Sequence, residues 1–351
     1  MSGQRQMVKE QNRDALLTVL DKHGYMPHQT LARIMVKEYP HLFTKLDAAR
    51  TIVRNFFGAH GTAHRQCDET KQQAAKYTVA PVEWPESITE WKWEPYALPQ
   101  LDGFWLIIAD LHVPFHEMQP ILAMVKYAKK LGKELKGILI NGDLMDQYTQ
   151  SWWSIDPKLT TWDSELTATR SFMAKLRQEF PKVEIVWKWS NHEYRFERVV
   201  LNMKPELANS DTIRSQLHLL NCLKSGGNEK IFDGITVIEH ENIVQFKDLA
   251  ILHGNEFGRG ISTPVNPART AFLRSKACCF VNHSHQSSQH AEQNLWGVQI
   301  VTRSGGCFCN MNPRWNRTAF LKWNWGFALL ETRGKWDIQN KRIMGDEVVT
   351  A

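Results

Sequence analysis

Residues 104–110 (FWLIIAD), 137–143 (GILINGD) and 183–193 (VEIVWKWSNHE) are three apolar runs that each end in polar or acidic residues. Segments with a helical pattern lie between them, at 118–131 and at about 164–179. Apolar runs that alternate with helices are typical of βαβ units around a buried parallel sheet. The central part of the chain is therefore predicted to be an α/β domain.

Beyond residue 230 the sequence pattern is one of successive strands. The strand-like segments are ITVIEH (235–240), NIVQF (242–246), LAILHG (249–254), CCFVNHSH (278–285), VQIVTRSG (298–305) and GFALLETR (326–333). An α/β half followed by a strand-rich half favours two packed mixed β-sheets flanked by helices. We assign this domain to residues 102–351.

The first 60 residues predict a separate, small all-helical domain. Apolar stripes place one helix before Gly24, a second at about 28–38 and a third that ends at Gly58. Arg50 and Arg54, four residues apart, project together from the outer face of the third helix. Such a triplet resembles a helix-turn-helix module; the alternative is a helical bundle with a solvated basic face. Residues 61–101, polar at first and then punctuated by prolines, are interpreted as a linker.

The positive charge of the chain is concentrated near its start. The net charge is +6, and residues 1–80 hold 12 Lys and Arg against 7 Asp and Glu, which leaves +1 for the rest. This asymmetry favours an acidic partner for the N-terminal domain, and nucleic acid is the partner we expect.

The composition excludes several classes of protein. No apolar stretch approaches the ~18 residues of a membrane-spanning helix, and the N-terminus lacks the apolar core of a signal peptide. The six cysteines form no C-x-x-C pair, which fits a reducing compartment. We therefore expect a cytoplasmic protein without a membrane partner.

Polar clusters of one chemical kind follow five of the strand-like runs. In chain order they are Asp110 and His112 (D-x-H), Asp143 and Asp146 (G-D-x-x-D), Asn191 and His192 (N-H-E), His253 (H-G), and His283 and His285 (H-x-H). Ligands of open α/β sheets gather at the carboxyl ends of strands, so these segments are predicted to converge. A mixed oxygen and nitrogen set without thiolate suits Mn²⁺, Fe or Zn²⁺, and one carboxylate can bridge two such ions.

This ordered set resembles the calcineurin-like metallophosphoesterase superfamily over residues 105–290. The overall plan is similar to that of phage and bacterial members, and more distantly to the nuclease subunit of the SbcCD complex. The resemblance implies the metallophosphoesterase fold and a location in the host cytoplasm if the chain is phage-encoded. It also implies two divalent ions, Mn²⁺ above all, with Fe, Zn²⁺, Ni²⁺ or Mg²⁺ as alternatives.

The resemblance implies a role for each matching residue. Asp110, His112 and His285 bind the first metal, Asn191, His253 and His283 bind the second, and Asp143 bridges the two. His192 is the general acid that protonates the leaving oxygen, Asp146 orients it, and a hydroxide shared by the metals attacks phosphorus.

Three departures from the family pattern stand out. Ser190 and Asn282 occupy positions that are usually glycine before N-H-E and H-x-H; asparagine tolerates a left-handed backbone. Gln147 and Tyr148 stand where the protein Ser/Thr phosphatase branch has Arg-Gly, which counts against a protein phosphatase.

The expected activity is that of a phosphodiesterase or nuclease acting on nucleic acid. Arg195 is a candidate contact for a phosphate oxygen, and Trp152 and Trp153 are candidates for stacking on bases. One alternative is a phosphatase or phosphodiesterase of nucleotides or phosphoproteins. A second is a non-catalytic nucleic-acid-binding protein with a structural metal. The oligomeric state stays open.

Overall fold

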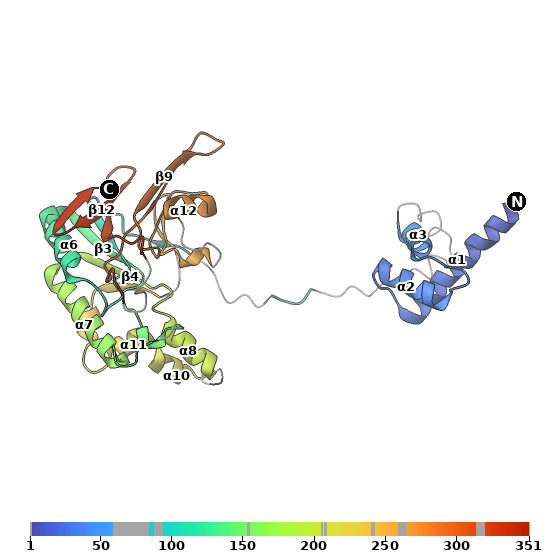
Figure 1. The fold of residues 1–351 in the computed structure, drawn as a ribbon, viewed down its shortest axis with the longest axis horizontal. Coiled ribbons are helices and arrows are strands. Elements are labelled where there is room, and N and C mark those ends of the chain that lie inside the picture. The colour runs from blue at the N-terminus through green and yellow to red at the C-terminus, as the bar shows by residue number, and fades with distance from the viewer. Residues whose placement is uncertain are drawn as a thin grey trace. The chain divides into compact units, whose positions relative to one another are not determined.

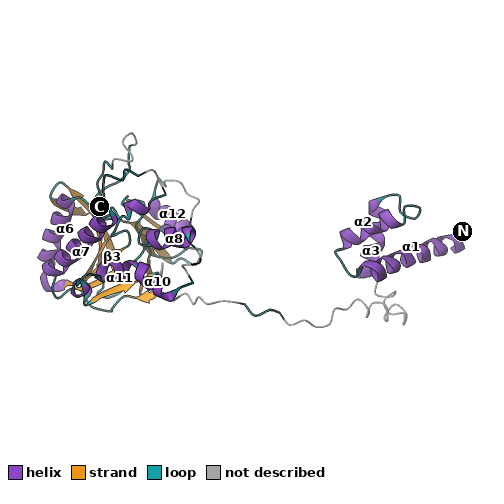
Figure 2. Ribbon diagram, turned by 90° about the horizontal axis from the view of Figure 1, so that it is seen from below, coloured by secondary structure: helices purple, strands orange, loops and turns teal. Residues whose placement is uncertain are grey.

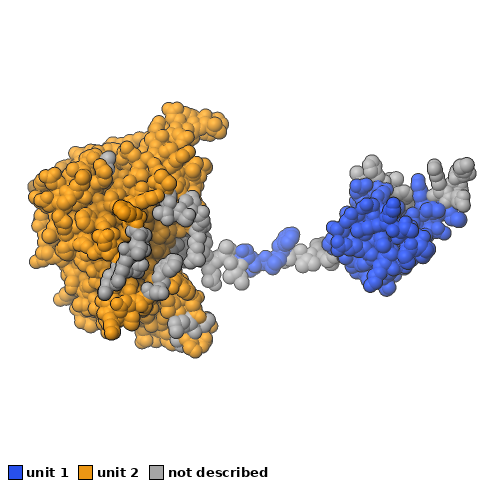
Figure 3. Space-filling model, in the orientation of Figure 1, with its two compact units in different colours: residues 1–90 blue, residues 91–351 orange. Residues whose placement is uncertain are grey.

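The computed structural model describes residues 2–58, 84–87, 94–152, 155–204, 206, 209–239, 243–258, 265–313 and 320–350. The chain divides into two compact units, residues 1–90 and 91–351, which Figure 3 distinguishes by colour. Each unit has its own hydrophobic core.

Within the described residues, the first unit contains three helices that enclose a small core. They are α1 (Ser2–His23), α2 (His28–Glu38) and α3 (Leu46–Phe57). The core side chains repeat at helical spacing, for example Ala49, Val53 and Phe56 on α3. The expected end of the first helix before Gly24 and the expected range of the second are confirmed. Arg50 and Arg54 are exposed on α3.

The strands of the second unit form two mixed sheets within the described residues, as Figure 2 shows in orange. The seven-stranded sheet has the order β13 (Glu347–Thr350), β12 (Asp337–Met344), β11 (Gly326–Glu331), β2 (Phe104–Ile108), β3 (Leu135–Asn141), β4 (Glu184–Lys188), β5 (Ile235–Ile238). The six-stranded sheet has the order β1 (Tyr96–Ala97), β6 (Val244–Phe246), β7 (Leu249–Ile251), β8 (Cys279–Val281), β10 (Gln299–Ser304), β9 (Ser288–Gln293). Strands β2 to β5 are parallel, as are β7, β8 and β10, whereas the outer strands include antiparallel pairs.

Successive side chains of a strand point to opposite faces of its sheet, so the seven-stranded sheet packs on both faces and the second unit has four layers. Trp105 and Ile107 of β2 pack with Phe280 of β8 in the core between the two sheets. Leu106 and Ile108, which point to the opposite face, pack in a second core with α6 (Met118–Leu131), α7 (Trp162–Glu179) and α11 (Leu219–Lys224). The outer face of the six-stranded sheet is covered by α12 (Pro267–Ser275). Figure 1 shows α6 and α7 on one flank of the strands and α12 on the other. Two mixed sheets flanked by helices are therefore confirmed.

Two further parts of this unit were not expected. Residues 94–101 were included in the expected linker, but β1 pairs in parallel with β6 and Leu98 is buried between the sheets. Two further helices, α8 (Arg195–Met203) and α10 (Asp211–Leu217), lie between β4 and β5 in the chain. In the part of the chain that the structure describes, no helix has the length and apolar character needed to cross a membrane.

Candidate metal centre

The predicted ligands follow the carboxyl ends of strands from both sheets. Asp110 and His112 come after β2, Asp143 after β3 and Asn191 after β4, in the seven-stranded sheet. His253 follows β7, and His283 and His285 follow β8, in the six-stranded sheet. Because these neighbouring strands are parallel, their ends open at one edge of each sheet. The donor atoms of six of these residues form two neighbouring clusters.

The first cluster consists of Asp110, His112 and His285. Their donor atoms lie within 4.8 Å of one another. The Nε2 atoms of His112 and His285 are 3.2 Å apart, and Nε2 of His285 is 3.2 Å from Oδ1 of Asp110. This is the trio that the sequence predicted for the first metal.

The second cluster consists of Asp143, His253 and His283. Nε2 of His253 lies 3.2 Å from Oδ2 of Asp143 and 3.3 Å from Nδ1 of His283. The same Asp143 oxygen is 3.7 Å from Nε2 of His112 in the first cluster. Asp143 therefore lies between the two groups, where a bridging carboxylate would be. Oδ1 of Asn191, the remaining predicted ligand, is buried and has no hydrogen-bond partner within the described residues.

The hydrogen bonds of Nδ1 in His253 and His112 determine which tautomer each imidazole ring adopts. Nδ1 of His253 donates to the carbonyl oxygen of Asn141 at 2.7 Å, and Nδ1 of His112 lies 2.8 Å from a carboxylate oxygen of Asp146. In a neutral imidazole the proton is then on Nδ1, and the lone pair of Nε2 faces the centre. Metal-binding histidines have this arrangement of an outer acceptor and an inner lone pair. The residues present therefore fit a divalent cation.

The buried carboxylates of the two clusters also favour a positive charge beside them. Asp110 and Asp143 are fully buried; burial alone would raise their pKa values, but the neighbouring histidines hold the pKa of each carboxyl below its usual range. Burial would lower the pKa of His253, yet the carboxylates of Asp143 and Asp110 raise it to about 10. Two buried carboxylates thus draw a cation toward them, whether a proton or a metal ion.

Unfavourable backbone conformations are concentrated at the same residues. Eight non-glycine residues in the described part of the chain have positive φ, and five of them are predicted ligands. These five are Asp110, His112, Asp143, His283 and His285, with φ between 52° and 66°. Such conformations cost free energy and persist where the surrounding structure enforces them, often at functional sites.

A buried carboxylate that the sequence reasoning missed holds the loops of the centre in place. Glu193 accepts hydrogen bonds from the backbone N–H groups of Leu144 at 2.7 Å, Ser190 at 2.9 Å and Asp143 at 3.2 Å. It therefore ties the loop after β3 to the loop after β4. The signal was present, since Glu193 completes the N-H-E motif.

Ser190 and Asn282, which stand where the superfamily pattern usually has glycine, both form hydrogen bonds within the centre. Ser190 Oγ accepts from the N–H of Asp143 at 2.8 Å and donates to its carboxylate. Asn282 Oδ1 accepts from Nδ2 of Asn141 at 2.8 Å. The expectation that Asn282 adopts a left-handed backbone conformation was wrong. The residue with positive φ at this place is His283, and Asn282 is not among the residues with positive φ.

His192 is held beside the two clusters. Its Nδ1 donates to the carbonyl oxygen of Asp146 at 2.8 Å, while its Nε2 accepts from a guanidinium nitrogen of Arg195 at 2.6 Å. The Asp146 carboxylate is closer to Nδ1 of His112, at 2.8 Å, than to Nδ1 of His192, at 3.3 Å. Asp146 thus positions both histidines, and it orients His192 mainly through its backbone. Burial lowers the pKa of His192, and His112 and Arg195 lower it further against the opposing effect of Asp143.

A pocket of about 640 Å³ opens onto this centre. Its walls are His112, Phe115, Asp143, Asp146, Tyr148, Ser151, His192, Arg195, His283, His285, Cys309, Asn310 and Trp323. The aromatic residues that line it are Phe115, Tyr148 and Trp323, none of which was a predicted substrate contact. Trp152 is exposed, carries the guanidinium of Arg198 over its ring at 5.1 Å, and does not line the pocket. Trp153 lies outside the described residues.

The comparisons with known proteins add no relative. No protein-family model matches the chain, and no curated protein matches it.

The first unit has a polar hollow of its own. His28 and Gln29 of α2 and Arg50, Thr51 and Arg54 of α3 line it. Its acidic member, Asp47, lies 3.1 Å from Nη1 of Arg50. The two predicted nucleic-acid contacts are therefore neighbours, and one of them is partly neutralised.

Proposed function

We propose that this chain is a dinuclear-metal-dependent phosphoesterase of the calcineurin-like type, and that it acts as a phosphodiesterase or nuclease on nucleic acid. The observation that carries the proposal is the pair of neighbouring clusters, Asp110–His112–His285 and Asp143–His253–His283, four of whose residues (His112, Asp143, His283 and His285) line one pocket. The order of two sheets between helical layers is the arrangement that the superfamily resemblance implies.

The chain's own residues divide the work between holding ions and handling the substrate. Asp110, His112 and His285 would hold one ion, with His253, His283 and Asn191 at the other and Asp143 between them. When bound, two divalent ions, most favourably Mn²⁺, would supply charge neutralisation at the phosphoryl oxygens. This ligand set contains only oxygen and nitrogen donors and no thiol, a combination that suits hard-to-borderline cations.

His192 and Arg195 face the same pocket and handle the proton and the phosphate. The guanidinium of Arg195 donates to Nε2 of His192 before substrate binds. A phosphoryl group offers this guanidinium a charged acceptor, because arginine and phosphate form strong paired hydrogen bonds. Nε2 of His192 is then available to carry a proton to the leaving oxygen.

The pocket favours a substrate that contains a nucleobase. Phe115 and Tyr148 contact each other edge to face, with ring centroids 5.3 Å apart, and Trp323 lies against His285 on another wall. Aromatic rings beside a phosphate-binding site stack on bases with little sequence preference. A free nucleotide would use the same surfaces, so nucleotide phosphoesters are the second candidate substrate.

One substrate screen under Mn²⁺ tests the proposal. Single- and double-stranded DNA and RNA, a simple phosphomonoester and a simple phosphodiester are assayed with wild type, with H192A and with H290A. We expect nucleic-acid cleavage that H192A lowers by at least about 100-fold, the lower range for general acid–base catalysis. H290A, which removes a histidine of β9 outside the pocket lining, serves as the matched control.

The outcomes separate the parts of the proposal. Hydrolysis of small phosphoesters without any cleavage of nucleic acid would refute the proposed substrate and favour nucleotides. Absence of hydrolysis together with absence of bound Mn²⁺ by mass spectrometry would refute the enzyme and leave a non-catalytic protein. Removal of residues 1–80 tests the first unit: unchanged turnover on nucleic acid would show that its basic face is not used for binding.

A further inference from the structure

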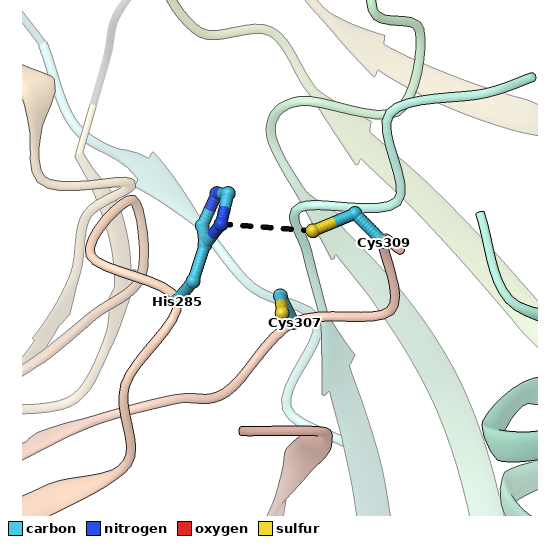
Figure 4. A group of neighbouring side chains, drawn as sticks. All are labelled: His285, Cys307 and Cys309. Atoms are coloured by element: carbon cyan, nitrogen blue, oxygen red, sulfur yellow. Dashed lines mark hydrogen bonds between the residues drawn. The ribbon is translucent and has the colours of Figure 1, made fainter. Parts of the chain in front are cut away.

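Two cysteine thiols lie next to the candidate metal centre, beside its ligand His285. Cys307 and Cys309 follow β10, are free and are buried. Their sulfur atoms and a ring nitrogen of His285 lie within 4.8 Å of one another. Figure 4 shows the sulfur of Cys309 directed at the imidazole of His285, with Cys307 beside them.

The backbone holds this group firmly. The N–H of Cys307 donates to the carbonyl of Asn324 at 3.0 Å, and the carbonyl of Cys309 accepts from the indole N–H of Trp325 at 3.0 Å. Between them, the N–H of Phe308 donates to the carbonyl of Asp110 at 3.1 Å. The thiols are therefore fixed to the same strand ends as the metal centre.

The spacing matches that of a tetrahedral thiolate site. With Zn–S of about 2.3 Å and Zn–N of about 2.0–2.1 Å, two such ligands of one tetrahedral ion lie about 3.6 Å apart. Sγ of Cys309 and Nδ1 of His285 are 3.6 Å apart. Each thiol also has a hydrogen-bond partner, Nδ1 of His285 for Cys309 and the carbonyl oxygen of Asn324 for Cys307 at 3.7 Å, and a Cd²⁺ titration separates these hydrogen bonds from metal binding.

We infer that Cys307, Cys309 and His285 form a binding site for one thiophilic divalent cation such as Zn²⁺ or Cd²⁺, which shares His285 with the catalytic donor set and is mutually exclusive with its first metal. Two thiolates and one imidazole nitrogen are the soft-to-borderline ligands that such ions select. On binding, the two S–H protons pass to solvent and the sulfur lone pairs form the metal bonds.

The exclusivity follows from the chemistry of His285. Its Nε2 is 3.2 Å from Asp110 and faces the first cluster, whereas its Nδ1 faces Cys309. A neutral imidazole carries one proton and offers one lone pair. Coordination through Nδ1 moves the proton to Nε2, which then cannot bind the first catalytic ion. Both Cys309 and His285 line the pocket, so an ion reaches the thiols from the substrate side.

Titration with Cd²⁺ tests the inference on the full chain. The protein is loaded with Mn²⁺ and dialysed, Cd²⁺ is added, the ultraviolet charge-transfer band of cadmium–thiolate bonds is recorded, and released Mn²⁺ is measured by mass spectrometry. We expect a band that saturates at one equivalent, with the intensity of two thiolates, and release of about one Mn²⁺ per chain. C307S and C309S should each weaken Cd²⁺ binding by at least about 10-fold. C279S, which removes a buried thiol of β8, should behave like wild type.

Three results would overturn the inference: no band in folded wild type, a band unchanged in both C307S and C309S, or Cd²⁺ binding with no loss of Mn²⁺. The wild-type measurement decides even if a serine variant does not fold. Absence of Mn²⁺ from the loaded wild type would count against the proposed function instead, and the cadmium band would still report on the thiol site.

Discussion

Replacement of Glu193 by alanine should destabilise the second unit strongly, although this residue is not a predicted metal ligand. Its side chain is 1% exposed and accepts from the backbone N–H groups of Leu144, Ser190 and Asp143 at 2.7–3.2 Å. Alanine leaves the N–H groups of Leu144 and Ser190 without an acceptor in a region closed to solvent, whereas the N–H of Asp143 keeps its hydrogen bond to Ser190 Oγ.

The size of the effect follows from the cost of an unsatisfied donor. Each buried N–H left without a partner costs about 1–3 kcal/mol, so two donors give a loss of at least about 2 kcal/mol in the free energy of unfolding. E193Q should cost less, about 1–3 kcal/mol, because its amide oxygen can take the place of the carboxylate oxygen that accepts from Ser190 and Asp143, which leaves only the N–H of Leu144 facing the amide NH₂.

Urea unfolding followed by tryptophan fluorescence measures this loss. Trp105, Trp187 and Trp189 are all buried in the second unit, so the signal reports on that unit. E229A, which removes an exposed carboxylate of the same unit, is the control. A loss below about 1 kcal/mol for E193A with an unchanged urea dependence would show that the loops do not depend on this carboxylate.

Three further predictions concern pH, space and charge. Burial and Asp146 raise the pKa of Glu165 to about 7; its folded state therefore holds a proton that the unfolded state has released, and stability falls as the pH rises from about 4.5 to about 7. E165Q should gain on wild type over that interval by up to about 3 kcal/mol, at about 1.4 kcal/mol per pKa unit, and a pH-independent difference in urea unfolding would contradict this. A Cβ on Gly142 would meet Nδ1 of His253 at 2.6 Å, so G142A should weaken Mn²⁺ binding by at least about 10-fold in calorimetry; G345A, also at positive φ but in open space, should not, and equal affinities would be the contrary result. Removal of metal with EDTA should lower the thermal unfolding midpoint of wild type, because Asp110 and Asp143 are buried charges, and D143N should reduce this sensitivity; a midpoint that ignores EDTA and Mn²⁺ would count against a metal at the centre.

The sequence predicted the fold where a strand or helix carries its own apolar pattern. The range expected for the second helix, 28–38, and the helix at 118–131 have the observed bounds, and the six strand-like runs after residue 230 all contain strands. β9, with the sequence SQHAEQ, was missed because it has no apolar run and is a strand only through pairing with β10. β12 was missed for the same reason, since DIQNKRIM alternates weakly and depends on β11.

The candidate centre was predictable to the extent that its residues form ordered motifs. The two clusters of donor atoms join residues up to 175 positions apart, and it was the resemblance carried by the ordered motifs that implied which of them to group. What the sequence did not indicate were contacts between loops: the closer approach of the Asp146 carboxylate to His112 and the aromatic lining from Phe115 and Trp323. Such contacts depend on loop conformations that no local pattern encodes.

The division of the centre between two sheets has a consequence for synthesis on the ribosome. The first carboxylate, Asp110, leaves the ribosome well before His285, and at about 5–20 residues per second the delay is on the order of 10–35 s. Strands β7 and β8 must also pair before the last histidines reach the carboxylates. The nascent chain therefore has no complete set of donor atoms until most of it has been made, so an ion bound there would be captured by a nearly folded protein, whose geometry rather than the order of translation would select it.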